Sequence, residues 1–373
     1  MRVAILGTRG VPANYGGFET FAEELGARLV ALGHEVTVYG RSHHVPPGLR
    51  EHRGIRVVVL PTLRHKYLDT VVHTGLSTFH ALGRGYDIAL FCNAANAVFT
   101  AWPRLSGTRT VLNVDGIERR RRKWNVLGRA WYALSELLAS WLPNAVVTDA
   151  RVIEAYYLSR YGVRTTFIPY GAGLEACAGT ATLTRFGLTP RGYVLYVSRL
   201  EPENNAHAVI AGFEASALAM PLVVVGDAPY AREYIESLKR AAGPRVVFTG
   251  GVYGGGYAEL QANAWVYVHA TEVGGTHPAL VEALGIGNCV LVNDVPENRE
   301  AAGDAALYFR AGEPGTLTAL LEEVAADPEL AERMRTAAAA RGRERYSWDV
   351  IAGKYAQLFE EVLGARGGIG RPA

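Results

Sequence analysis

Short apolar runs that end in a glycine or a polar residue recur along the whole chain, and stretches with helical spacing follow most of them. Residues 2–7 (RVAILG) form the first run, apolar residues recur at helical spacing from Phe18 to Leu32, and residues 35–40 form the next run. A continuous apolar run fits a strand buried on both faces, and the helical period fits an amphipathic helix. The alternation predicts parallel sheets with helices on both faces.

This alternation occurs twice. The predicted strands are 2–7, 35–40, 55–61, 87–93, 110–116, 145–150 and 167–171 in the first half, and 192–200, 222–227, 245–250, 264–270, 288–294 and 305–309 in the second. Helices are expected between them, at 230–242 and 278–286 among others, and a last helix at 349–364. Small and polar residues accumulate at 171–190. We therefore predict two doubly wound, Rossmann-like α/β domains facing a cleft, which 373 residues can accommodate.

Composition excludes several classes of protein. The chain carries 38 Lys and Arg against 36 Asp and Glu, a net charge of +2, so its surface as a whole is not built for nucleic acid. The cysteines (Cys92, Cys177 and Cys289) are far apart and odd in number, which argues against a disulfide framework and fits a reducing cytosol. No signal peptide or membrane-spanning apolar stretch is recognisable. We expect a cytoplasmic protein.

In doubly wound sheets, ligands bind beyond the carboxyl ends of the strands, so the loops that follow strands are the candidate sites. After the first strand, residues 7–19 (GTRGVPANYGGFE) hold four glycines and precede a helix whose first N–H groups attract anions. Two interpretations remain open, a phosphate or substrate loop and a glycine-rich turn. The loop lacks G-x-G-x-x-G, so a nicotinamide oxidoreductase is disfavoured.

Several loops of the second half contain residues that are suited to binding a ligand. Arg199 follows its first predicted strand, and a guanidinium can bind two phosphate oxygens, although a surface salt bridge is the alternative. Residues 248–256 hold five glycines, which permit close backbone approach to a ligand. In 272–288, Glu282 lies among apolar residues just after Pro278. Such a carboxylate must be paired or bind a ligand such as a vicinal diol; a buried salt bridge is the alternative.

These segments resemble those of family 4 glycosyltransferases, which have the GT-B fold, and more narrowly a bacterial rhamnosyltransferase-like subgroup that opens with GTRGVPANYGGFE. The matching blocks are 7–25, 113–124, 167–172, 199–205, 274–285 and 296–309. The resemblance implies an acceptor-binding domain at 1–171, a nucleotide-sugar-binding domain at 190–345, and a C-terminal helix at about 350–365 that returns to the first domain.

The resemblance also implies roles for single residues. Arg199 would hold the donor diphosphate, Glu282 the ribose hydroxyls, and the loop with Gly250, Val252 and Tyr253 would flank the base.

In the first domain, Gly16 and Gly17 would approach the donor phosphate across the cleft. Asp115 would face the acceptor or the transferred sugar. Arg199 and Asp115 are the residues that we expect to act in catalysis.

The chain departs from the family pattern at two positions. The family's lysine in R-x4-K is Asn204 here, which we still place in the donor site. The first glutamate of its Glu-x7-Glu pair is Gly274, and whether Glu272 substitutes for it stays open. Backbone amides of Gly274, Gly275 and Thr276 are expected to bind phosphate or sugar instead.

We expect no metal site. No DxD follows a predicted strand, and the ten histidines show no HxxxH or HExxH spacing. The adjacent His43 and His44 are expected in a solvated loop.

A basic run precedes a stripe of apolar residues at helical spacing. The run suits anionic lipid headgroups or a diphosphate-linked acceptor, and for the stripe we favour core packing over an interfacial position. The run comprises Arg119, Arg120, Arg121, Arg122 and Lys123, and the stripe comprises Leu127, Trp131, Leu134, Leu138 and Trp141.

Together these features predict a retaining, metal-independent glycosyltransferase of cell-surface polysaccharide synthesis, without a cofactor. The expected donor is dTDP-rhamnose, and the expected acceptor is a saccharide or a lipid-linked glycan at the inner face of the membrane. The alternatives are glucosyl, galactosyl or mannosyl transfer from a UDP or GDP donor, a nucleotide-sugar epimerase of the same architecture, and a non-catalytic glycan-binding protein.

Overall fold

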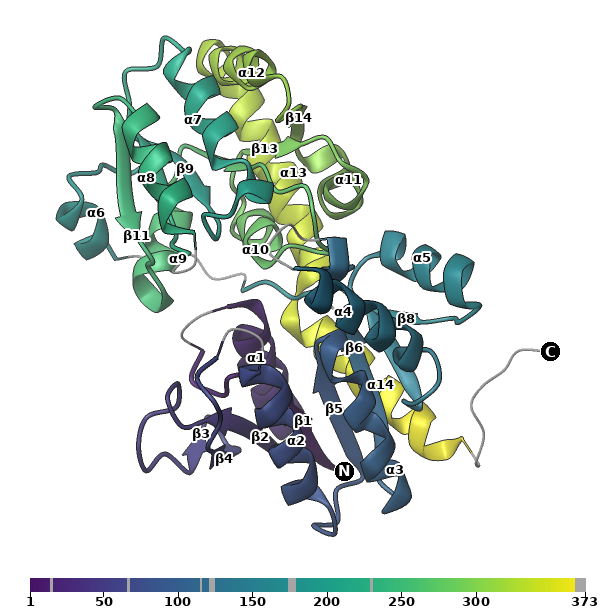
Figure 1. Cartoon of the computed structure of the whole chain (residues 1–373). Coiled ribbons are helices and arrows are strands. Elements are labelled where there is room, and N and C mark those ends of the chain that lie inside the picture. Colours follow the sequence, from purple (N-terminus) through teal and green to yellow (C-terminus); the bar gives the residue numbers. More distant parts are fainter. Residues whose placement is uncertain are drawn as a thin grey trace. The chain divides into compact units, whose positions relative to one another are not determined.

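In the computed structural model, the chain folds into two compact units. The first unit comprises Met1–Tyr170 and Trp348–Ala373, and the second comprises Gly171–Ser347. The structure describes residues 1–13, 16–65, 68–114, 116–120, 125–173, 179–228 and 231–365. Each unit contains one largely parallel sheet with helices packed against it (Figure 1), which confirms the predicted fold class.

The sheet of the first unit has the order β3-β4-β2-β1-β5-β6-β7-β8 in the described residues. Every adjacent pair is parallel except β3 and β4, which are antiparallel; the sequence analysis predicted β4 and missed the two-residue β3. Two-residue strands lack the apolar run on which that analysis relies. The strands are β1 (Arg2–Leu6), β2 (Glu35–Arg41), β3 (Glu51–His52), β4 (Ile55–Leu60), β5 (Ile88–Cys92), β6 (Arg109–Val114), β7 (Ala145–Thr148) and β8 (Thr166–Phe167).

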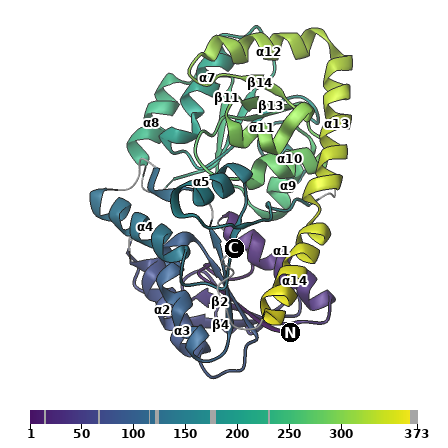
Figure 2. The same ribbon diagram turned by 90° about the vertical axis from the view of Figure 1, so that its right-hand side faces the viewer.

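Helices cover both faces of this sheet. Figure 2 shows α2, α3 and α4 on one side of it and α1 and α14 on the other. The helices are α1 (Gly17–Ala31), α2 (Asp69–Ala81), α3 (Ala101–Leu105), α4 (Val126–Ala139), α5 (Arg151–Tyr161) and α14 (Trp348–Gly364), with 3-10 turns η1 (Ala94–Thr100) and η2 (Glu118–Arg120).

The last helix, α14, packs on the first unit although the second unit precedes it in the chain. Its Tyr355 ring lies 5.3 Å from the Phe21 ring of α1, centroid to centroid. The Asn113 side chain at the end of β6 donates a hydrogen bond to the Tyr355 hydroxyl (2.8 Å), and Arg28 of α1 donates to Asp349 (2.7 Å). Buried aromatic contacts and two polar contacts thus attach this helix to the sheet.

The second unit has the sheet order β11-β10-β9-β12-β13-β14, with every adjacent pair parallel. Its strands are β9 (Val194–Val197), β10 (Leu222–Val225), β11 (Val246–Gly250), β12 (Val266–His269), β13 (Val290–Asn293) and β14 (Leu307–Phe309). Its helices are α6 (Ala181–Arg185), α7 (Ala206–Glu214), α8 (Arg232–Ala241), α9 (Gly254–Ala262), α10 (Pro278–Ile286), α11 (Pro296–Ala302), α12 (Pro314–Ala326) and α13 (Pro328–Tyr346), with 3-10 turns η3 (Pro202–Asn204) and η4 (Gly303–Ala305).

Two further findings bear on the expectations from composition. Cys92 and Cys289 are buried, and Cys177 lies outside the described residues. Among the described helices, none is both long enough and apolar enough to cross a membrane.

We predict that Gly342→Ala destabilises the second unit, although alanine usually favours a helix. A Cβ atom at Gly342 of α13 would lie 2.5 Å from the Cα of Gly285 in α10, so the two helices would have to separate. Overpacking of this kind costs about 1–3 kcal/mol in the free energy of unfolding, which denaturant unfolding measures. The matched control is Gly353→Ala in α14, where a Cβ meets nothing within 4 Å. It should stabilise by about 0.5–1 kcal/mol; equal effects would contradict the close contact.

Candidate active site

The loops after four neighbouring strands of the second unit meet at the carboxyl edge of its sheet. The backbone N–H of Gly226, after β10, donates to the carbonyl of Gly250, at the end of β11 (2.9 Å). Glu272, after β12, donates its N–H to the carbonyl of Glu203, after β9 (3.1 Å). These hydrogen bonds join the loops in two pairs, those after β10 and β11 and those after β9 and β12.

Gly226 brings the two pairs of loops together. Its φ of +141° is a conformation that favours glycine, and a Cβ atom there would lie 1.8 Å from the carbonyl oxygen of Ser198. The loop after β10 therefore lies directly against the loop after β9.

Arg199 is held at its backbone and exposed at its side chain. The Asn204 amide donates to the Arg199 carbonyl (2.6 Å), and the buried Tyr196 hydroxyl donates to the Asn204 carbonyl (2.6 Å). The Arg199 side chain is 44% exposed, and its contact with Glu201 is long (3.9 Å). The guanidinium is thus available to an anion. Asn204 is buried. Its side-chain amide therefore positions the backbone of Arg199.

Glu282 lies at the end of a chain of hydrogen bonds that the sequence did not reveal. The Tyr257 hydroxyl of α9 donates to Glu282 Oε2, the Gln261 amide donates to the Tyr257 hydroxyl (3.0 Å), and the Asn288 amide donates to Gln261 Oε1 (3.1 Å). Burial, followed by the charge of Glu282, raises the pKa of Tyr257 well above its usual value, so the hydroxyl keeps its proton and remains a donor. The carboxylate is therefore oriented by a buried phenol.

The segment Gly274–Thr276 is buried and leads directly into α10. Gly274 has a φ of +153°, and a Cβ atom there would lie 2.5 Å from the ring of His277, so the ring packs against the glycine backbone. The His277 ring also lies 4.9 Å from that of His269 at the end of β12. Burial lowers the pKa of His269 to about 3, so this ring is neutral near pH 7. The N-terminus of α10 thus follows a compact loop and favours an anion.

The glycine-rich loop after β11 carries an exposed aromatic ring. Gly250 has a φ of +71°, and Tyr253 comes just before α9. A Cβ atom at Gly251 would lie 3.0 Å from the Tyr253 ring, so the ring covers the loop backbone. Val252 is half-buried beside it. The loop therefore presents a flat aromatic surface at the same edge of the sheet.

In the first unit, two carboxylates of α1 hold the glycine-rich loop after β1. Glu19 accepts a hydrogen bond from the N–H of Arg9 (2.9 Å), and Glu23 accepts one from the N–H of Ala13 (2.6 Å). Burial acts to raise the pKa of Glu23, but the hydrogen bond from Ala13 and the contacts with His52 and Arg53 outweigh it, so its pKa is lowered. These glutamates escaped the sequence analysis because helix spacing alone does not show which carboxylates reach a preceding loop.

The remaining predicted residues of the first unit have different outcomes. Gly16 directly precedes α1, and Gly17 is its first residue, as the expected helix start requires. Asp115, directly after β6, lies outside the described residues. The structure therefore leaves its role as a prediction.

The interpretation of the apolar stripe as core is wrong for three of its members. Leu127 is 78% exposed, Trp141 is 68% exposed, and Leu134 is also exposed. The buried side of α4 is formed by residues such as Tyr132 and Ala139, each one position after a residue of the predicted stripe. The stripe is largely a surface feature.

Arg119 contributes to a buried polar cluster rather than to a free basic run. It donates to Glu136 (3.0 Å) and to the Tyr156 hydroxyl (2.6 Å), and Tyr156 and Tyr161 both donate to the same Glu136. Its charge is thus compensated within the fold. Arg121, Arg122 and Lys123, as well as the side chain of Arg120, lie outside the described residues.

His43 and His44 are not in a solvated loop. Their rings are 4.3 Å apart, both are partly buried, and with Asp69 they place potential metal ligands within 4.8 Å of one another. Asp69 accepts a hydrogen bond from the buried Arg41 (2.6 Å). Because that guanidinium already compensates the carboxylate, the cluster is better suited to an ion pair than to a dication.

Two family models match the chain. The model described as Glycosyltransferase Family 4 matches residues 15–175, and the model described as Glycosyl transferases group 1 matches residues 187–341. The chain is a glycosyltransferase. Among its relatives is a GDP-mannose-dependent alpha-mannosyltransferase of Mycobacterium tuberculosis (strain CDC 1551 / Oshkosh), 28% identical over 411 aligned residues that cover 98% of each chain.

Solved structures show the same fold. Sucrose-phosphate synthase from Thermosynechococcus elongatus superposes with a TM-score of 0.80 at 19% identity, over 98% of this chain and all of that one. Anabaena HepE in complex with UDP and glucose superposes with a TM-score of 0.79 at 17% identity, over 97% of this chain and all of that one. The glycosyltransferase therefore has the GT-B fold. These matches support the family and do not extend to the rhamnosyltransferase-like subgroup.

We predict that Tyr257→Phe weakens nucleotide binding by this glycosyltransferase, because Glu282 loses the hydroxyl that orients it. A hydrogen bond to a charged group contributes about 1.5 kcal/mol or more, which is roughly tenfold in the dissociation constant. Isothermal titration with nucleoside diphosphates measures this dissociation constant. Tyr308→Phe is the control, since that hydroxyl donates to the Gly303 carbonyl (2.6 Å) in the same unit. It should leave the affinity unchanged; a similar loss in both variants would indicate general destabilisation.

Proposed function

We propose that the second unit binds the donor nucleotide sugar at the carboxyl edge of its sheet. Arg199 and the N–H groups at the start of α10 would bind the diphosphate, and Glu282 the ribose hydroxyls. The observation that carries this proposal is that Arg199, whose backbone is held by Asn204 and whose guanidinium is exposed, and the hydrogen-bonded carboxylate of Glu282 follow neighbouring strands. Such a pair suits a ligand that has both an anionic group and hydroxyls.

For the donor, we propose a nucleotide diphosphate hexose with its base beside Tyr253. Mannosyl transfer from a GDP donor has support from the mycobacterial relative, whose name states dependence on GDP-mannose. Transfer of rhamnose from dTDP-rhamnose, expected from the sequence motifs, is the second candidate. The exposed ring of Tyr253 would stack on either base.

The proposed reaction retains the anomeric configuration and proceeds without a metal or cofactor. Arg199 would stabilise the negative charge that grows on the departing diphosphate, and this electrostatic contribution together with positioning would lower the barrier. Gly16 and Gly17 would allow close approach of the donor phosphate, and Asp115 would face the acceptor or the transferred sugar.

We predict that Arg199→Ala weakens binding of the nucleoside diphosphate while affinity for the bare nucleoside changes little. Loss of charge-assisted hydrogen bonds should cost about 1.5–3 kcal/mol of binding free energy. Arg199→Lys should restore only part of the lost affinity, because lysine lacks the planar guanidinium. Turnover should fall further than binding, since the charge grows in the transition state.

The test is a donor panel of GDP-mannose, dTDP-rhamnose and UDP-glucose, assayed by titration and by acceptor-dependent release of the nucleoside diphosphate. Anomeric configuration in the product is read by NMR. Binding of none of these donors would overturn the proposal, and conversion of the donor without an acceptor and without hydrolysis would favour the epimerase alternative. An equal loss of nucleoside and nucleoside diphosphate in Arg199→Ala would show that Arg199 only supports the fold.

For the acceptor, we propose a saccharide or a lipid-linked glycan, reached by a protein that lies in the cytoplasm and rests peripherally on an anionic membrane. Three neighbouring helices of the first unit, α2, α3 and α4 (Figure 2), support this proposal with exposed large apolar side chains. The rings of Phe79 in α2 and Trp102 in α3 lie 5.7 Å apart, centroid to centroid, and Leu105 is 82% exposed. A group of exposed apolar residues on adjoining helices is typical of an interaction surface, and aromatic rings suit a membrane interface.

We predict that the double variant Leu127→Ser/Trp141→Ser loses attachment to anionic vesicles at low salt. These side chains are exposed and carry apolar area that only an interface would bury. Cosedimentation with vesicles of anionic lipids, compared with vesicles of neutral lipids, measures this attachment. Leu32→Ser, at the exposed end of α1, is the control. Arg119 is left intact because its ion pair with Glu136 belongs to the fold. If the double variant cosediments like the wild type, these helices do not form the membrane contact.

A further inference from the structure

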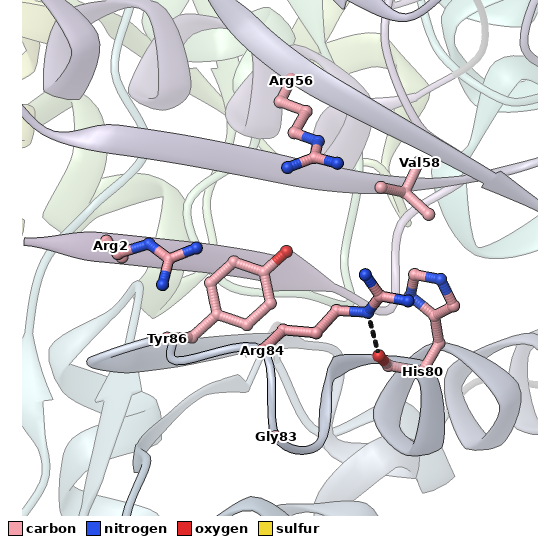
Figure 3. Close-up of a pocket in the computed structure, with 7 residues that line it drawn as sticks. All are labelled: Arg2, Arg56, Val58, His80, Gly83, Arg84 and Tyr86. Atoms are coloured by element: carbon pink, nitrogen blue, oxygen red, sulfur yellow. Dashed lines mark hydrogen bonds between the residues drawn. The ribbon is translucent and has the colours of Figure 1, made fainter.

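A cavity of about 280 Å³ lies at the amino-terminal edge of the sheet in the first unit. Arg2 at the start of β1, Arg56 near the start of β4, and His80, Arg84 and Tyr86 around the end of α2 line it (Figure 3). The candidate loops of this unit follow the carboxyl ends of its strands. The cavity is therefore at the opposite edge from them, and none of the roles assigned above involves it.

The lining of this cavity is strongly cationic. It has three guanidinium groups, and its lining residues include no carboxylate. Arg56 and Arg84 form no ion pair within the described part of the chain, and Arg2 pairs with the largely exposed Glu35 at 3.3 Å. Burial, followed by the charges of Arg84 and Arg56, lowers the pKa of His80, which lines the same cavity as both arginines. Like charges this close repel one another unless an anion lies between them.

The guanidinium groups are oriented by contacts that leave N–H groups for a ligand. Arg2 Nη1 donates to the Gly85 carbonyl (2.9 Å), and Arg84 Nε donates to the His80 carbonyl (2.7 Å), so both Nη atoms of Arg84 remain for other acceptors. Gly85 permits this close approach, because a Cβ atom there would lie 2.6 Å from Arg2 Nη1. Figure 3 shows the three arginines grouped around the Tyr86 ring, and Arg2 lies 5.8 Å from its centroid.

Two of the lining residues, His80 and Tyr86, contact a buried hydroxyl. The buried Tyr39 hydroxyl lies 3.2 Å from His80 Nδ1 and 3.3 Å from the Tyr86 hydroxyl. Burial raises the pKa of Tyr39, so this hydroxyl stays protonated and adds no negative charge. The contacts of His80 and Tyr86 with this hydroxyl thus bring no negative charge, and the charged lining residues are arginines. Such a lining suits a small multivalent anion rather than a cation or an apolar ligand.

We propose that this cavity is a second anion site that binds a phosphate group, separate from the donor site at Arg199. Arginine forks match the geometry of phosphate oxygens, and three of them from different elements can surround one phosphate. The phosphate can belong to a soluble molecule, such as inorganic phosphate or a sugar phosphate, or to the headgroup of an anionic phospholipid. The neighbouring residue of His80, Phe79, belongs to the exposed apolar surface described above, so both sources are compatible with the position.

The experiment compares the wild type with the double variant Arg56→Ser/Arg84→Ser. The control is Arg164→Ser, which removes an exposed arginine of the same unit elsewhere on its surface. Titration with inorganic phosphate, at constant ionic strength set with chloride, should show binding to the wild type and the control, and at least about tenfold weaker binding to the double variant. Circular dichroism checks that the double variant is folded.

A second arm separates the two sources of phosphate. Flotation with phosphatidate vesicles, against phosphatidylcholine vesicles, should depend on Arg56 and Arg84 if the ligand is a headgroup and be independent of them if it is a soluble phosphate. Weaker phosphate binding by the double variant supports a site for a soluble phosphate, and loss of its flotation with phosphatidate supports a site for a headgroup. If the double variant matches the wild type toward both phosphate and phosphatidate, or the wild type binds neither, the proposal is overturned. Nucleotide-sugar binding, measured in parallel, should be unchanged in every variant, so this failure and failure of the proposed donor site are distinguishable.

Discussion

The parallel direction of the strands in the second unit is the constraint on which the candidate site depends. Because neighbouring strands point the same way, the loops that follow β11, β10, β9 and β12 emerge at one edge of the sheet. Hydrogen bonds between these loops and the close approach at Gly226 then bring them into contact. Arg199 and Glu282, 83 positions apart in the sequence, follow adjacent strands for this reason.

Residues behind the site determine how its charged groups are presented. Asn204 and Tyr196 hold the backbone of Arg199, while Tyr257 and the amides of Gln261 and Asn288 orient Glu282. All of these supports are neutral at pH 7, so they orient the charged groups without cancelling their charge. Asn204 stands where the resemblance leads us to expect a lysine, and in the structure it makes a neutral contact with the Arg199 backbone.

The first unit distributes charge and apolar surface differently. Its carboxylates Glu19, Glu23 and Glu136 each serve a structural partner, the first two on the loop after β1 and the third on Arg119 and two tyrosines. Its excess arginines and its exposed apolar side chains are found instead at the amino-terminal edge of the sheet and on α2, α3 and α4. Sequence spacing cannot separate these groups, because a paired and an unpaired arginine look alike in a sequence.

The sequence by itself determined the two α/β halves, most strand positions and the full extent of α10, because apolar runs and helical spacing are local signals of burial. It also indicated Arg199 and Glu282, since a charged residue just after a buried strand or among apolar neighbours requires a partner. Only the tertiary structure decided the rest. It gave Arg119 and Glu282 their partners and turned three of the five residues of the apolar stripe toward the surface. Each of these depends on which distant residues meet across a sheet or between helices, and that information is not present in any short segment of the chain.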